Sequence, residues 1–197
     1  MSSASIPDID LEHLDRVVVV GTSCSGKTTL AGRLAKIFGT KHIELDELHW
    51  APNWVERDDN EFRALAREAV CPDRWATDGN YGQVRDIVWG RATAVIWLNY
   101  SFPVVFSRCV RRTFRRVFTR EVIFSGNVES ARIAFFSRES LFLWVIRTHF
   151  RRRRTYAKLL AEPRWSHIRF LTFRSPAQAE RFLRDVETRH RGRVISA

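Results

Sequence analysis

The pattern of apolar and polar positions divides the chain into short apolar runs that alternate with longer amphipathic stretches. Four consecutive valines at 17–20 are typical of a parallel strand, because such strands are buried on both faces and favour β-branched residues. Apolar residues between Leu30 and Phe38 recur at helical spacing. The same criteria predict further strands at 41–45, 73–78, 94–99 and 167–173, and further helices at 58–70, 102–118, 141–160 and from 176 onward.

Strands that alternate with helices predict an α/β fold with three layers and a five-stranded parallel sheet, whose strand ends gather the ligand-binding residues. A chain of 197 residues fits a single domain, 1–197. Local signals mark three of the helix starts. They are Asp58 or Asp59 as an N-cap, Pro103 as a first helical residue, and Ser175 as an N-cap with Gln178 as its capping-box partner.

The loop between the first strand and the first helix has the sequence GTSCSGKT, which matches the pattern G-x-x-x-x-G-K-[ST]. Glycine tolerates unusual dihedral angles, so backbone N–H groups at a helix N-terminus can close around phosphate oxygens. The loop therefore predicts a P-loop NTPase fold that binds ATP, with an ordinary glycine turn as the alternative. The predicted nucleotide-binding residues are Gly21, Thr22, Ser23, Cys24, Ser25, Gly26, Lys27, Thr28 and Thr29.

Four side chains near this loop are candidates for the chemistry of phosphoryl transfer. Lys27 is expected to reach the β- and γ-phosphates. The hydroxyl of Thr28 and the carboxylate of Asp78, at the end of the strand predicted beside the first, are expected to hold Mg²⁺. Asp46, after the second strand, is predicted to orient or deprotonate an acceptor hydroxyl or to share the metal. For both acidic residues the alternative is a capping role at a strand end or a helix start.

Charge changes the picture in the second half of the chain. The net charge is +11, and residues 1–100 carry 11 Lys and Arg against 15 Asp and Glu, whereas residues 101–197 carry 22 against 7. Such an asymmetry suits a nucleic-acid partner, but arginines in a lid over a triphosphate would also explain it. The arginines at 151–154 surround a helix on all sides, which favours a solubilising or nucleic-acid-binding patch.

Arginines on the helix predicted at 102–118 lie on or near one stripe at i, i+3 and i+4 spacing. Arginine suits bidentate recognition of phosphate, and a solvated helix face is the alternative. The stripe consists of Arg108, Arg112, Arg115 and Arg116.

Several features bear on compartment and on the acceptor. The three cysteines show neither CxxC nor metal-ligand spacing, which favours a reducing cytoplasm. The first residues lack the pattern of a secretory signal, and no apolar run approaches membrane-spanning length. Trp50 and Trp54, with His49 between Asp46 and Trp54, suit the wall of an acceptor pocket, although large aromatic residues more often belong to a core.

The phosphate loop, LDELHW, DGNY, GNVES and RTHFRRRRTY together resemble the nucleoside-monophosphate-kinase-like P-loop family, which includes adenylate, shikimate and gluconate kinases. Within it, the chain is most similar to small bacterial proteins described as adenylate-kinase-like or DNA topology modulation proteins. The resemblance implies that Asp46 faces the acceptor and that Arg112 and Arg116 lead into a lid. In adenylate kinases an arginine shortly after the position of DGNY grips the acceptor phosphate. This sequence lacks that arginine, and Arg57 and Arg85 are candidates to replace it.

The leading hypothesis is an ATP- and Mg²⁺-dependent small-molecule kinase that transfers the γ-phosphoryl group to a nucleoside monophosphate or a hydroxyl acceptor. Its predicted catalytic residues are Lys27, Asp46, Arg112 and Arg116. Residues 112–135 are predicted to form a lid that is open without nucleotide and closes about Gly126. The alternative is a nucleotide-binding regulatory protein that binds nucleic acid through its basic C-terminal half, and a third hypothesis is a membrane-surface protein.

Overall fold

The structure is a computed structural model that describes residues 11–119, 122–123, 127–128 and 141–196. Within these ranges the side chains of Glu12 and of residues 116–119, 122–123, 127–128, 141–144 and 194–196 are left undescribed.

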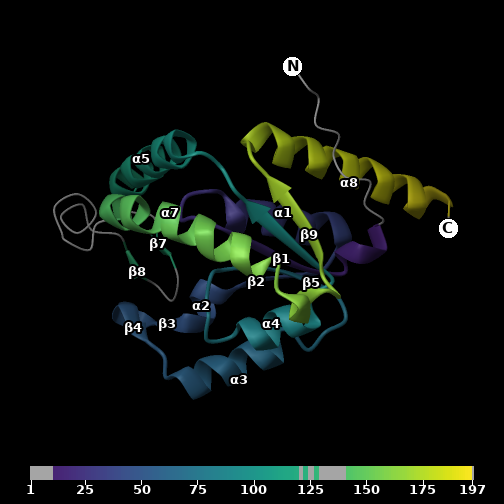
Figure 1. Ribbon diagram of the computed structural model, residues 1–197, viewed down its shortest axis with the longest axis horizontal. Helices are drawn as coiled ribbons and strands as arrows, with labels where there is room; N and C mark the ends of the chain where they lie inside the picture. The colour runs from purple at the N-terminus through teal and green to yellow at the C-terminus, as the bar shows by residue number, and fades with distance from the viewer. Residues whose placement is uncertain (1–10, 120–121, 124–126, 129–140, 197) are drawn as a thin grey trace.

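A five-stranded parallel sheet forms the middle layer of the molecule (Figure 1). Its strands, in spatial order, are β2 (Lys41–Glu44), β5 (Trp75–Asp78), β1 (Arg16–Gly21), β6 (Ala94–Leu98) and β9 (Arg169–Phe173). All four strand pairs are parallel. In the central strand β1, Val17 and Val19 pack into one core and Val18 and Val20 into the other, which explains four consecutive valines.

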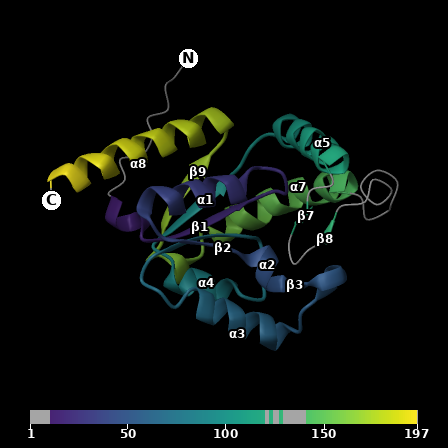
Figure 2. The same ribbon diagram turned by 180° about the vertical axis from the view of Figure 1, so that it is seen from behind.

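Helices cover both faces of this sheet. The helices are α1 (Lys27–Phe38), α2 (Leu45–His49), α3 (Asp59–Ala69), α4 (Arg85–Arg91), α5 (Phe102–Thr119), α7 (Leu141–Leu159) and α8 (Pro176–Ser196). One core lies between the sheet and α1, α5 and α8, and the other lies between the sheet and α3, α4 and the C-terminal half of α7. Helix α7 crosses in front of the sheet in Figure 1, and α1 does so in the reverse view of Figure 2. The predicted three-layer P-loop fold with five parallel strands is therefore confirmed.

Some short helices, turns and strands were not predicted from the sequence. They are α2, α4, the 3₁₀ turns η1 (Leu11–Leu14), η2 (Pro52–Trp54) and η4 (Pro163–Trp165), and the antiparallel pair β3 (Trp50–Ala51) and β4 (Val55–Glu56). One of them corrects the expected place of Asp46. Strand β2 ends at Glu44, and Asp46 lies in the first turn of α2 rather than at a strand end. A helix of five residues is too short to show a periodic apolar pattern.

The predicted helix starts are largely as expected. Asp58, not Asp59, caps α3, because its side chain accepts hydrogen bonds from the backbone N–H groups of Asn60 and Glu61. Ser175 Oγ accepts from the N–H of Gln178 at 3.3 Å. The side chain of Gln178 accepts at 2.7 Å from the N–H of Arg174, one residue before the position that a capping box requires.

The predicted lid region is described only in part. Its described residues complete α5 and form a small antiparallel pair of β7 (Val122–Ile123) and β8 (Asn127–Val128). The backbone of β8 lies next to the turn η2. Gly126 and the rest of 112–135, namely 120–121, 124–125 and 129–135, lie outside the described residues. Over the described part of the chain, no helix has the length and apolar content needed to cross a membrane.

Candidate active site

The phosphate loop leaves β1 at the centre of the sheet and enters α1. Gly21 and Gly26 have φ angles of +154° and +97°, which side chains rarely adopt. A Cβ atom on Gly21 would lie 2.9 Å from the carbonyl oxygen of Leu98, and one on Gly26 would lie 2.9 Å from Nη2 of Arg108. Conformation therefore favours glycine at both positions, and the close approach of the Leu98 backbone also requires it at Gly21. The loop wraps the N-terminus of α1, where backbone N–H groups favour an anion.

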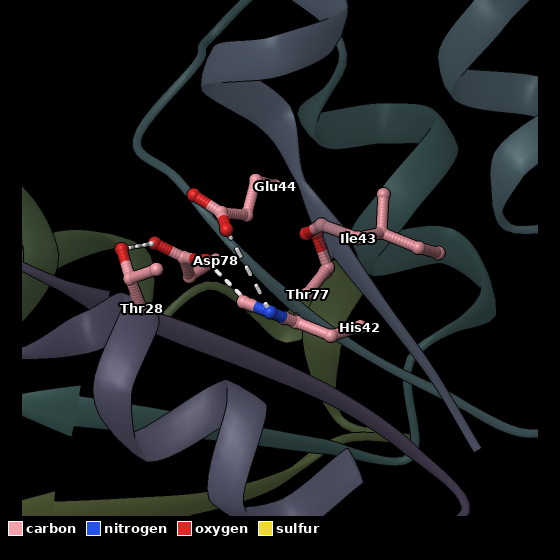
Figure 3. A network of polar contacts seen from close by, with 6 residues as sticks. All are labelled: Thr28, His42, Ile43, Glu44, Thr77 and Asp78. Carbon is pink, nitrogen blue, oxygen red and sulfur yellow. Dashed lines mark hydrogen bonds and ion pairs between the residues drawn. The ribbon is translucent and has the colours of Figure 1, made fainter. Parts of the chain in front are cut away.

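Two oxygen-bearing side chains meet beside the loop (Figure 3). Thr28 Oγ1 donates a hydrogen bond to Oδ2 of Asp78 at 2.8 Å. Two neighbouring ligands of octahedral Mg²⁺ at 2.0–2.1 Å would lie about 2.9 Å apart, so this pair of hard oxygen donors fits the metal. In the described residues no cluster of three or more His, Cys, Asp or Glu side chains could hold a metal ion. Phosphate oxygens and water would therefore have to complete the coordination.

A histidine that the sequence analysis did not consider supports this pair. Nε2 of His42, on β2, lies 3.0 Å from Oδ1 of Asp78, and Nδ1 lies 3.9 Å from Oε1 of Glu44 (Figure 3). Burial lowers the pKa of His42, but the hydrogen bond to Asp78 and the charges of Asp78 and Glu44 outweigh it and raise the pKa overall. Asp78 itself is buried, with one oxygen held by His42 and the other turned to Thr28.

Lys27 lies where charges of both signs converge. Burial lowers its pKa, and the carboxylates of Asp78 and Asp46 oppose that effect. The guanidinium groups of Arg152 and Arg112 lower the pKa of Lys27 further. Two carboxylates and two guanidinium groups are therefore within electrostatic reach of the loop lysine.

The turn after β5 connects the parts of the site. Asp78 contacts Thr28, and two positions later Asn80 exchanges two hydrogen bonds with the backbone of Gly21. The hydroxyl of Tyr81 then donates to Oδ1 of Asp46 at 2.5 Å. The segment DGNY thus contacts Thr28, Gly21 and Asp46 in succession. The sequence analysis singled out only Asp78 from this segment.

Aromatic residues pack around His49, close to Asp46 in helix α2. His49 is buried, and its ring lies 5.0 Å from those of Trp50 and Phe62 and 4.6 Å from that of Tyr81. Trp54 packs edge-on against Trp50 at 5.7 Å and is 40% exposed. Burial raises the pKa of the Tyr81 hydroxyl, and the neighbouring charge of Asp46 raises it further, so Tyr81 remains a hydrogen-bond donor at neutral pH.

Two arginines of α5 lie over the phosphate loop, as the predicted stripe requires. The guanidinium of Arg108 lies against Gly26, and Nη1 of Arg112 lies 3.7 Å from Sγ of Cys24. The side chain of Arg116, the other predicted catalytic arginine, lies outside the described residues. Cys24 and Cys109 are buried, Cys71 is exposed, and none of the three forms a disulfide.

Helix α7 contributes Arg152 to the candidate site, although the sequence analysis assigned all four arginines at 151–154 to a surface patch. Arg152 is half-buried, and its guanidinium lies within electrostatic reach of the carboxylate of Asp46. Burial lowers the pKa of Arg152. Its neighbours Arg151, Arg153 and Arg154 are exposed. The run at 151–154 is therefore divided, with one arginine turned to the site and three to the surface.

A signal for Arg152 was present in the sequence. His149, Arg152 and Tyr156 recur at i, i+3 and i+7, and the buried residues Val145 and Leu159 lie on the same stripe. Reading the four arginines as one charged block concealed the one that shares the inner face.

Comparisons with known proteins add similar structures but no family. No family model matches the chain, and no curated protein matches it significantly. A crystal structure of a gluconokinase from Sinorhizobium meliloti 1021 is 18% identical, covers 90% of this chain and 98% of its own, and has a TM-score of 0.45. A sugar kinase from Janibacter sp. HTCC2649 is 23% identical, with 85% and 91% covered and a TM-score of 0.46. An uncharacterized protein from Eubacterium ventriosum is 11% identical, with 88% and 99% covered and a TM-score of 0.46.

Similarity at this level transfers neither an activity nor a substrate to the chain. The finer resemblance to adenylate-kinase-like or DNA topology modulation proteins stays a prediction.

Proposed function

We propose that the protein is an ATP- and Mg²⁺-dependent kinase that phosphorylates a hydroxyl group of a small molecule. The observation that carries this proposal is the convergence on Lys27 of two carboxylates, Asp78 and Asp46, and two arginines, Arg152 and Arg112. Phosphoryl transfer needs a phosphate cradle, a metal-side carboxylate, an acceptor-side carboxylate and cations for the transferred charge. All four are within reach of one lysine here.

Each residue then has a distinct task. The loop backbone and Lys27 bind the β- and γ-phosphates, and Thr28 with Asp78 would hold Mg²⁺, which neutralises phosphate charge when bound. Asp46 accepts the proton of the attacking acceptor hydroxyl. The hydroxyl oxygen bonds to the γ-phosphorus as the bond between that phosphorus and the bridging oxygen breaks, and ADP leaves with the bridging oxygen. Tyr81 donates to Oδ1 of Asp46 and so leaves Oδ2 for the acceptor. Arg112 and Arg152 stabilise the charge on the transferred group.

The charges on the acceptor side favour a hydroxyl over a monophosphate. Burial raises the pKa of Glu44, and the carboxylates of Asp78, Glu47 and Asp46 raise it further against the opposing effect of His42, so negative charge gathers beside the proposed acceptor-side residue Asp46. The two arginines proposed to grip an acceptor phosphate are engaged elsewhere. Arg57 donates to Glu61 at 2.7 Å, and the guanidinium of Arg85 lies 5.7 Å above the ring of Trp89.

A coupled ADP-release assay across sugars, polyols, hydroxy acids and nucleoside monophosphates tests this proposal. We expect turnover with a hydroxylated acceptor, dependence on added Mg²⁺, and only background ATP hydrolysis without acceptor. Preferred turnover of a nucleoside monophosphate would contradict the hydroxyl acceptor. Absence of phosphoryl transfer to any acceptor, despite ATP binding, would favour the regulatory alternative.

One observation favours a second function, binding of single-stranded nucleic acid. The outer face of α7 presents the exposed side chains of Arg147, Phe150, Arg151, Arg154, Thr155 and Lys158 side by side. Phe150 is 56% exposed, so its ring could stack on a base while the cations contact phosphates. We propose this face as the nucleic-acid surface. It is distinct from the inner face of α7 that carries Arg152. We also propose a cytoplasmic location, since none of the three cysteines forms a disulfide.

A further inference from the structure

A chain of hydrogen bonds joins α7 to the first residue of the phosphate loop. The backbone N–H of Gly21 donates to Oδ1 of Asn80 at 3.2 Å, and Nδ2 of Asn80 donates to the carbonyl oxygen of Gly21 at 2.8 Å. The hydroxyl of Tyr156 donates to the same Oδ1 at 2.7 Å. One side-chain amide thus holds both polar groups of Gly21, and one tyrosine holds the amide.

This chain permits only one orientation of the amide. Oδ1 of Asn80 accepts from two donors, and Nδ2 faces an acceptor. Rotating the amide by a half-turn would place its NH₂ group against the N–H of Gly21 and the hydroxyl of Tyr156. Burial raises the pKa of Tyr156 to about 12, so its hydroxyl remains a donor at neutral pH. The backbone of Gly21 therefore fixes which way Asn80 presents its oxygen, and the hydroxyl of Tyr156 adds a second donor to that oxygen.

A second contact lies close to the first. Nδ1 of His149, two helical turns before Tyr156 on α7, lies 3.4 Å from Oγ1 of Thr22. His149 and Thr22 are both buried. The inner face of α7 thus contacts the second residue of the phosphate loop directly and the first through Asn80.

We infer that Asn80 and Tyr156 are positioning residues that hold the phosphate loop in its nucleotide-binding conformation. The inference rests on the proposed function, because it concerns how the same site binds ATP. Gly21 begins the loop at a φ of +154°, so a backbone N–H and carbonyl fixed at this point set the direction of the residues that follow. Tyr156 acts through Asn80, so its contribution exists only while Asn80 is present.

Binding of a non-hydrolysable ATP analogue with Mg²⁺, measured by calorimetry, tests the inference without requiring turnover. We expect Tyr156→Phe to weaken binding about 3- to 10-fold, the range for loss of one or two hydrogen bonds, and Asn80→Ala to weaken it by about 10-fold or more. Tyr100→Phe is the matched control, because it also removes a buried tyrosine hydroxyl. It should bind as the wild type does. The increase in melting temperature on adding analogue should shrink in the first two variants only.

The double variant separates positioning from general packing. If Tyr156 acts through Asn80, adding Tyr156→Phe to Asn80→Ala should change affinity less than about twofold. Multiplying losses, or wild-type binding by Tyr156→Phe, would overturn the inference. If Asn80→Ala does not fold, Asn80→Asp replaces it, since it removes the Nδ2 donor with little change in shape. A wild-type protein that fails to bind the analogue would overturn both the inference and the proposed function. Wild-type binding without phosphoryl transfer would overturn only the latter.

Discussion

The two sides of the candidate site are built in different ways. The phosphate loop is one continuous segment, 21–28, and its conformation follows from its own glycines and from the strand and helix that it joins. The opposite side is assembled from Asp46 on α2, Tyr81 after β5 and Arg152 on α7. A site can thus have one side encoded locally and another that exists only once distant segments have packed.

We expect the largest effect of a single substitution on catalysis in the phosphate loop. Lys27→Ala removes the cation that the loop directs at the β- and γ-phosphates, and we expect kcat/KM to fall by about 100- to 1,000-fold with the fold intact. Lys36→Ala is the control, because Lys36 is an exposed lysine on the same helix. Steady-state kinetics with circular dichroism measure both. A folded Lys27→Ala variant with wild-type turnover would remove the basis of the kinase proposal.

Asp78 and Asp46 should differ in which kinetic quantity they control. Asp78→Asn should raise the Mg²⁺ concentration needed for half-maximal rate by about 10-fold, because Asp78 lies 2.8 Å from Thr28 on the metal side. Asp46→Asn should leave the Mg²⁺ requirement unchanged and lower kcat by about 100-fold, the size of a general-base effect. Magnesium titrations of both variants give the answer. Equal shifts in metal dependence would contradict this division of roles.

The accuracy of the sequence analysis follows the same distinction. All five strands of the parallel sheet were predicted, and in β1 and β6 the apolar runs with β-branched residues reflect burial on both faces directly. The pattern G-x-x-x-x-G-K-[ST] located the loop, because all of its residues are adjacent in sequence. Helices α2 and α4 were missed because five and seven residues are too few to display a helical period.

Residues whose roles depend on contacts between distant segments were missed. His42 faces Asp78 because β2 and β5 are adjacent, and no local pattern marks it. Asn80 and Tyr156 meet across 76 positions of the chain. Arg152 was hidden among identical neighbours, and only its share of an apolar stripe distinguishes it. The order of strands in the sheet and the docking of α7 decide these contacts.

Arg152 tests the side of the site that distant segments form, because an exposed arginine next to it provides a matched control. Arg152→Gln should lower kcat by about 10- to 100-fold, because a half-buried guanidinium beside Lys27 and Asp46 is replaced by a neutral group. Arg153→Gln makes the same chemical change on the adjacent, exposed residue and should alter kcat less than twofold. Rates at saturating ATP and acceptor provide the comparison. Similar losses in the two variants would indicate that general charge, not position, is responsible.

The smallest effect on phosphoryl transfer is expected on the outer face of α7. We expect the triple variant Arg151→Gln, Arg154→Gln and Lys158→Gln to keep kcat within about twofold, because these exposed residues face away from Lys27. The affinity of this variant for single-stranded oligonucleotide should depend less on salt concentration than that of the wild type. Each lost phosphate contact lowers the slope of log K against log salt by about 0.7, so three should lower it by about 2.

The arginines of α8 provide a control with the same change in charge. Arg184, Arg189 and Arg191 each lie within 4 Å of a carboxylate one turn earlier on that helix, at 3.8, 3.2 and 2.7 Å. Their charges are partly neutralised within the helix, so replacing all three by Gln should change the salt slope by less than about 0.7, one contact. Fluorescence anisotropy at four salt concentrations measures both triples. Equal changes would mean that net charge alone attracts the oligonucleotide. A loss confined to the α7 triple would assign the two faces of this helix to different ligands, ATP on the inside and nucleic acid on the outside.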